Sequence, residues 1–329
     1  MAHLPSSASL RRMRRGTPTL WIALAIVYTV WGSTYLAIRV AIETMPPMIM
    51  ASVRFLIAGG ILYVIAIRRG DRDGDRPGWR QWRAAAIVGT LLFLGGNGGV
   101  VWAEQRVPSG VAALIVASVP LWMALIAFVA LKERLPRIAV AGLVVGFAGT
   151  ALLVRPSGSE HIDTAGAAVL IGASISWAIG TLYATRAPLP ARGSVSAAMQ
   201  LLTGGVVLGI VAVASGELGR VHPDRFSRSS VLALAYLIVF GALVAFSAYA
   251  YLVRNASPAI VSTYAYINPV IAVLLGWAIL DEAIGSTTLI AGAIIVVAVA
   301  MIVSGKVRKE GEPAAGAPPV EDELAAESA

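Results

Sequence analysis

The sequence contains no cysteine and only three histidines, and charged residues make up 13% of its 329 positions. Without cysteine there is no disulfide framework, thiolate nucleophile or thiolate metal site. The histidines, His3, His161 and His222, all lie outside the long apolar stretches. Intramembrane proteases need a Ser/His pair, paired aspartates or a histidine zinc site within the membrane. We therefore expect no enzyme activity, no metal and no cofactor.

Long apolar stretches dominate what is present, because hydrophobic residues account for 57% of the chain. A helix needs roughly 20 apolar residues to cross a hydrocarbon core of about 30 Å. Ten stretches approach or exceed this length, at residues 20–41, 48–67, 84–103, 110–131, 138–154, 165–185, 195–215, 231–253, 259–280 and 286–304. The sequence thus predicts an all-α integral membrane protein with about ten transmembrane helices in a lipid bilayer.

The second half of the chain repeats the first, with Pro120 matching Pro269 and Glu133 matching Glu282. Each half holds five of the apolar stretches, and an odd number forces the two copies into opposite orientations. We therefore expect two inverted five-helix repeats, at 19–154 and 165–304. Inverted repeats are typical of secondary transporters, which bind their substrates near the midplane where the halves meet.

The formal net charge of +8 comes from 26 Lys and Arg residues. Most of them fall in the N-terminal segment 1–18, in the tail and in the loops on the same side of the predicted bundle. The positive-inside rule then places both termini in the cytoplasm. The charge therefore sets topology and does not indicate a nucleic-acid partner. The tail 305–329 is rich in Pro, Ala and Glu, which predicts a disordered cytoplasmic segment.

Several motifs together resemble one transporter family. They are Trp-Gly-Ser-Thr-Tyr-Leu-Ala-Ile at 31–38, the double proline at 46–47, Arg-Phe-Leu-Ile-Ala-Gly at 54–59, and Glu133 and Glu282. Over about residues 20–304 the chain resembles the EamA branch of the drug/metabolite transporter superfamily. The resemblance implies a ten-helix bundle and export of small metabolites across the inner membrane. It also implies a central cavity lined mainly by the first four helices of each repeat.

Aromatic and amide side chains on three predicted helices are candidate substrate contacts. Trp31 and Tyr35 share a helix face, as do Tyr264 and Asn268, because each pair is four residues apart. Asn97 lies in a glycine-rich run and is a candidate polar wall. Ordinary core packing or interhelical hydrogen bonding is the alternative for each. Ser247 and Tyr251 form a further candidate wall, on the stretch 231–253.

Arg54 is the only charge well inside a predicted span. A buried charge is costly, so it faces water, carbonyl groups or an anion. Arg54 either binds a substrate carboxylate or has a structural role, in which it ties helix ends together through Glu104 or backbone carbonyls. We favour the structural role. Pro120 and Pro269 are predicted mid-helix hinges, with static kinks as the alternative.

No Asp, Glu or His lies in the middle of a predicted span. A proton-coupled drug or cation antiporter normally needs such a group, so we keep this function as the alternative to a metabolite exporter. A passive pore or an intramembrane enzyme is less favoured still. We predict a secondary transporter that exports small neutral, zwitterionic or amphipathic metabolites, above all amino-acid-like solutes. It would work by alternating access around a midplane cavity, as a monomer or weak homodimer.

Overall fold

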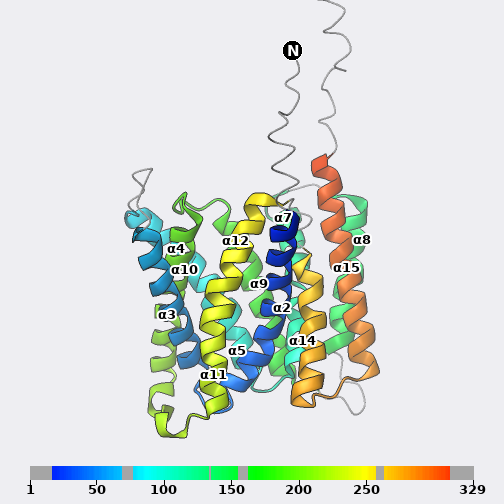
Figure 1. The fold of residues 1–329 in the computed structure, drawn as a ribbon. Helices are drawn as coiled ribbons and strands as arrows, with labels where there is room; N and C mark the ends of the chain where they lie inside the picture. Colours follow the sequence, from blue (N-terminus) through cyan, green and yellow to red (C-terminus); the bar gives the residue numbers. More distant parts are fainter. Residues whose placement is uncertain (1–16, 69–76, 133–134, 155–161, 257–262, 312–329) are drawn as a thin grey trace, which may run out of the picture.

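The computed structural model describes residues 17–68, 77–132, 135–154, 162–256 and 263–311, and every regular element in these ranges is helical (Figure 1). Most of the basic N-terminus, residues 312–329 of the tail, and Glu133 lie outside the described residues. The predicted all-α fold is therefore confirmed.

Helices occupy the five predicted spans of the first repeat. They are α2 (Thr17–Ala41), α3 (Pro47–Arg68), a third span built from α4 (Trp79–Gly89), the π-helix η1 (Thr90–Gly98) and α5 (Gly99–Ala103), a fourth built from α6 (Ser109–Val116) and α7 (Val119–Val129), and α8 (Arg137–Val154). Their side chains are mostly apolar and their backbone groups bond within each helix, as a bilayer requires.

The second repeat has the same order of elements. It comprises α9 (Thr164–Ala184), α10 (Gly193–Ala214), a third span of α11 (Arg228–Tyr236), the π-helix η4 (Leu237–Val244) and α12 (Ala245–Asn255), then α14 (Tyr264–Leu280) and α15 (Ser286–Gly311). The short 3₁₀ turns η2 (Glu217–Arg220) and η3 (Pro223–Arg225) precede α11. The last helix continues past Ser304, where the predicted span ended.

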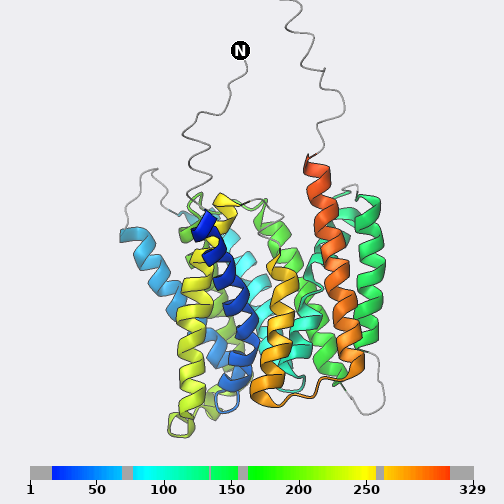
Figure 2. The ribbon, with the colours of Figure 1, turned by 45° about the vertical axis from the view of Figure 1, so that its right-hand side comes forward.

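Eight helical spans in the described residues are long and apolar enough to cross a membrane, and two shorter apolar helices, Arg137–Leu153 and Tyr264–Leu280, accompany them. The start of α2 and the end of α15 lie at the same end of the bundle, here named the termini end (Figures 1 and 2). The opposite end is named the far end. The α6, α9, α11 and α15 helices begin there.

Helix packing reveals the pseudo-twofold relation between the repeats. The second helices of the two repeats, α3 and α10, pack together, and so do the fifth helices, α8 and α15. The first helix α2 instead packs between α14 and the α11–η4–α12 helix of the second repeat. Its counterpart α9 packs in the same way against α6–α7 and η1–α5 of the first. Each repeat has thus exchanged its first helix with the other.

A π-helical segment interrupts the third helix of both repeats, η1 in the first and η4 in the second. π-Helical turns are rare and occur most often at functional sites. The wider turn changes which side chains share a face, so the α-helical period of 3.6 residues does not predict the helix faces across this segment. Both segments contribute to the cavity described below.

The two matched prolines differ in their local structure. The helix breaks at Ala117–Ser118, and Pro120 lies in the first turn of the next helix, α7. A residue in the first turn needs no backbone N–H for the helix, so proline fits there. The Ser118 hydroxyl donates to the Ile115 carbonyl at 2.6 Å across this break. Pro269 lies inside the continuous helix α14. Pro120 therefore separates two helices where a mid-helix kink was expected, and the hinge role of both prolines stays a prediction.

Two carboxylates join the repeats at the far end by capping helix N-termini. Glu217 accepts hydrogen bonds from the backbone N–H groups of Met48 and Ile49, at 2.9 and 3.1 Å. Glu282 accepts from the backbone N–H groups of Ser109 and Gly110, at 2.7 and 3.1 Å, and from the Ser109 hydroxyl at 3.0 Å. Both caps satisfy donors that have no partner within the helix and place negative charge at its positive end.

Candidate substrate cavity

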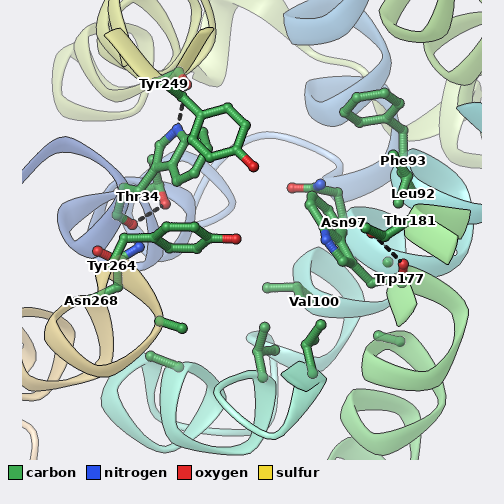
Figure 3. Close-up of a pocket in the computed structure, with 18 of the residues that line it drawn as sticks. Thr34, Leu92, Phe93, Asn97, Val100, Trp177, Thr181, Tyr249, Tyr264 and Asn268 are labelled. Carbon is green, nitrogen blue, oxygen red and sulfur yellow. Dashed lines mark hydrogen bonds between the residues drawn. The ribbon is translucent and has the colours of Figure 1, made fainter. Parts of the chain in front are cut away.

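A cavity of about 550 Å³ lies between two walls of the bundle. One wall consists of α2, η4–α12 and α14, and the other of η1, α6–α7 and α9 (Figure 3). Each wall contains helices of both repeats, because α2 and α9 are exchanged. The cavity therefore lies where relative movement of the two walls would change its shape.

The cavity extends toward the termini end. Ala184 and Val303, which line it near the ends of α9 and α15, are partly exposed. Ile38 and Val100 line it toward the far end, where only 3% and 7% of their surface is accessible. Toward the far end, the cavity is thus bordered by tightly packed side chains.

Three aromatic rings on three helices form one side of the cavity. Trp31 of α2 contacts Tyr249 of α12 and Tyr264 of α14, with ring centroids 5.1 and 5.2 Å apart, and the two tyrosine rings are 5.9 Å apart. The Trp31 indole N–H donates to the Gly241 carbonyl at 3.3 Å. This bond fixes the indole, and the tyrosine hydroxyls point across the cavity (Figure 3).

Asn97 and Trp177 lie on the opposite side, where Asn97 points toward the tyrosines (Figure 3). Helix α9 approaches η1 closely because the neighbouring residues of η1 are glycines. A Cβ at Gly96 would lie 2.6 Å from the Trp177 ring. The glycine-rich run therefore serves both purposes considered from the sequence, since it packs against α9 and presents Asn97 to the cavity.

Asn268 lines the cavity where α2 and α14 meet. Its Oδ1 atom is buried and has no hydrogen-bond partner among the described residues. The two helices touch at Gly32, where a Cβ would lie 3.1 Å from the Asn268 carbonyl oxygen. A buried acceptor without a partner is uncommon and expensive in a folded protein, so a ligand or water is the expected partner.

Arg54 borders the far-end part of the cavity and is 6% exposed. Its guanidinium carbon lies 4.9 Å from the centroid of the Phe55 ring. Its Nε atom is buried without a hydrogen-bond partner, and within the described chain no ion pair joins Arg54 to Glu104. The expected structural tie to Glu104 is therefore not made as a direct contact.

All six residues selected from the sequence as candidate contacts line this one cavity: Trp31, Tyr35, Arg54, Asn97, Tyr264 and Asn268. Pro120 and Pro269 also border it. Residues that lie up to 237 positions apart in sequence are thus brought together by the exchange of first helices. Their roles in substrate binding remain predictions.

Sequence reasoning missed two prominent wall residues, Trp177 and Tyr249. Trp177 lies on α9, the counterpart of α2, so each of the two first helices contributes a tryptophan to the cavity. On the stretch 231–253, Tyr249 was not selected from the sequence, whereas Ser247 and Tyr251 were. Neither lines the cavity, and the Ser247 hydroxyl donates to the Leu243 carbonyl at 2.7 Å. Tyr249 lies between Ser247 and Tyr251 in α12 and therefore points to the opposite side of the helix.

A model of the EamA-like transporter family matches residues 19–155 and 164–304, one match for each repeat. The chain belongs to this family. It is 40% identical to the uncharacterized inner membrane transporter YedA of Escherichia coli K12, over 94% of this chain and 98% of YedA. It is 26% identical to the uncharacterized transporter YvbV of Bacillus subtilis, over 90% of this chain and 94% of YvbV.

A solved crystal structure of a protein that is 20% identical in sequence superposes with a TM-score of 0.58, over 90% of this chain and 99% of its own. That likeness concerns the fold alone. Family membership, the two matched repeats and the apolar helices together identify a multi-pass membrane transporter.

Proposed function

We propose that this EamA family member exports small neutral, zwitterionic or amphipathic metabolites, above all amino-acid-like solutes, across the inner membrane. The observation that carries the proposal is the composition of the cavity wall. Arg54 is the one charged residue among its lining residues, and aromatic and apolar side chains provide most of the remainder. The volume of about 550 Å³ suits a small organic solute.

The lining residues supply a plausible contact for each part of an amino-acid-like solute. The Arg54 guanidinium would hold the carboxylate, because it is a planar donor whose Nε has no hydrogen-bond partner among the described residues. The rings of Trp31, Tyr249 and Tyr264 would pack against the apolar part. The amides of Asn97 and Asn268 would serve its remaining polar groups.

Alternating access requires the cavity to open at one end at a time. In the described state the cavity extends toward the termini end, and the Glu217 and Glu282 caps join the two repeats at the far end. With both termini in the cytoplasm, as the distribution of basic residues predicts, this state would load substrate from the cytoplasm. Export would then require the walls to separate at the far end, with Pro120 and Pro269 as the proposed hinges.

The test is counterflow into proteoliposomes that contain the purified protein, with a panel of labelled amino acids, sugars and nucleosides. We expect saturable counterflow of a carboxylate-bearing neutral solute. Arg54→Gln should lower it at least tenfold, whereas Arg68→Gln, an exposed arginine on the same helix, should leave it near wild type. Equal counterflow by both variants would remove Arg54 from the binding site.

A cationic dye with an imposed pH gradient tests the other reading, a proton-coupled drug or cation antiporter. A cation would find Arg54 and no carboxylate among the residues that line the cavity. We therefore expect no gradient-driven dye uptake. Uptake that depends on the gradient, with no counterflow of any neutral solute, would replace the proposed function by that antiporter.

A further inference from the structure

Glu104 is a fully buried carboxylate beside the far-end part of the cavity. It lies one residue beyond α5 and none of its surface is accessible. Neither carboxylate oxygen has a hydrogen-bond partner among the described residues. Burial of an ionised carboxylate without hydrogen bonds is very costly, so such a group either binds a proton or depends on nearby positive charge.

Four titratable or charged groups from the surrounding elements interact electrostatically with Glu104. Arg39 and Tyr35 come from α2, Arg54 from α3, and Glu282 from the segment after α14. Arg39 donates to the backbone carbonyl of Glu104, so that bond does not satisfy the carboxylate. Burial, and next the charge of Glu282, raises the pKa of Glu104 well above its ordinary value, while Arg39 and Arg54 oppose this rise.

Glu104 and Arg54 therefore influence each other without forming an ion pair. The positive charge of Arg54 favours the ionised form of Glu104. The ionised carboxylate in turn partly neutralises the positive charge that Arg54 presents to an anion in the cavity. An anion bound to Arg54 from the cavity would offset that positive charge. Glu104 would then lose part of what stabilises its ionised form and bind a proton more tightly.

We propose that Glu104 is a proton-binding site linked to the cavity through Arg54, so that a carboxylate-bearing solute and one proton bind cooperatively. The inference rests on the proposed role of Arg54 as the group that holds a solute carboxylate. The proton comes from solvent and forms one O–H bond on Glu104, and no other bond is made or broken. By reciprocity, protonation of Glu104 strengthens carboxylate binding by the same factor.

The direction of the pH dependence follows from this linkage. Below the titration midpoint Glu104 is neutral, Arg54 is fully available, and carboxylate affinity is high. As pH rises through the midpoint, Glu104 ionises and the affinity falls. Glu104→Gln imitates the neutral form, so its affinity should equal the low-pH affinity of the wild type and stay there at higher pH.

The experiment follows carboxyl protonation by infrared difference spectroscopy on the purified protein, titrated from about pH 4 to about pH 10 to span ordinary and raised carboxyl values. Acetate is the probe, as the smallest carboxylate that could reach Arg54, and chloride at equal ionic strength is its control. We expect a buried carboxyl signal that titrates in the wild type and in Glu43→Gln, an exposed glutamate at the same end, and is absent in Glu104→Gln. Saturating acetate should raise the midpoint by about one pH unit, a tenfold coupling.

Arg54→Lys keeps the charge at the cavity, and it should retain part of the acetate effect where Arg54→Gln loses it. A wild-type midpoint that acetate does not move, or the absence of any Glu104 titration in this range, would overturn the proposal. Counterflow of a neutral solute together with an unmoved midpoint leaves the proposed function standing and rejects the proton linkage. A moved midpoint without any counterflow supports the linkage and rejects the proposed function.

Discussion

At the scale of single residues, two of the side chains that line the cavity, Arg54 and Asn268, carry a buried polar atom without a partner among the described residues. The Asn268 Oδ1 atom is such an acceptor, whereas the Trp31 indole N–H is already bound to Gly241. A group retained only for stability would be expected to have its partner inside the protein, because an unsatisfied buried polar atom costs about 1–3 kcal/mol. Asn268 and Arg54 are therefore the residues whose substitution should separate transport from folding.

Asn268→Leu should reduce transport at least tenfold without lowering stability. Leucine has a similar volume and removes an acceptor that nothing in the described chain satisfies. Thermal unfolding in detergent and counterflow of the identified solute measure the two effects. A large loss of thermal stability with normal counterflow would show instead that Asn268 is a structural residue.

Trp31→Leu should weaken substrate affinity about tenfold, since the lost aromatic contacts correspond to about 1.4 kcal/mol. Trp21→Leu is the matched control on the same helix, because Trp21 is 64% exposed and does not line the cavity. The concentration that gives half-maximal counterflow is the quantity to compare. Equal values for the two variants would contradict a role of Trp31 in the cavity.

At the scale of elements, helix caps and π-helical segments determine contacts between the repeats that the apolar pattern of the sequence does not predict. The α6 helix begins at Ser109 with Glu282 as its partner, so the cap of a first-repeat helix comes from the second repeat. η1 and η4 similarly set which faces of the third helices meet the cavity. These features join the repeats and give each wall its composition.

Glu282→Gln should lower stability by about 1 kcal/mol, because it replaces a charged helix cap by a neutral one. Asp281→Asn is the control, since Asp281 is exposed and has a φ of 51°, a conformation that asparagine tolerates. Chemical or thermal unfolding in detergent gives the difference. Equal unfolding midpoints in both variants would mean that the Glu282 cap contributes nothing to stability.

At the scale of the whole molecule, the exchange of α2 and α9 produces a cavity whose walls each combine both repeats. In the described state this cavity extends toward the termini end, where Ala184 and Val303 border it. Because the chain contains no cysteine, a single introduced thiol reports accessibility without background.

Thr181→Cys should react with a small, membrane-impermeant thiol reagent added from the side that holds the termini. Ser174→Cys should not react, because Ser174 lies on the same helix and is fully buried. Labelling of sealed vesicles of known orientation measures both sites. Reaction of Thr181→Cys only from the side opposite the termini would mean that the cavity opens at the far end.

The sequence by itself determined the helical fold, the two repeats and the approximate positions of the apolar helices. Twenty-residue apolar runs leave no other arrangement in a bilayer, because backbone groups must be satisfied within the segment. It also identified the candidate cavity residues that stand out chemically, such as Arg54 and Asn268, because polar groups are rare inside apolar runs.

Only the tertiary structure decided which faces meet and which groups lack partners. Tyr249 and Trp177 line the cavity because α12 and the exchanged helix α9 pack around it, and local apolar periodicity does not encode that packing. Glu104 looked like an ordinary helix-end carboxylate, yet it is fully buried because helices distant in sequence enclose it. Burial and partnership are properties of several segments together, so they become visible only once those segments are packed.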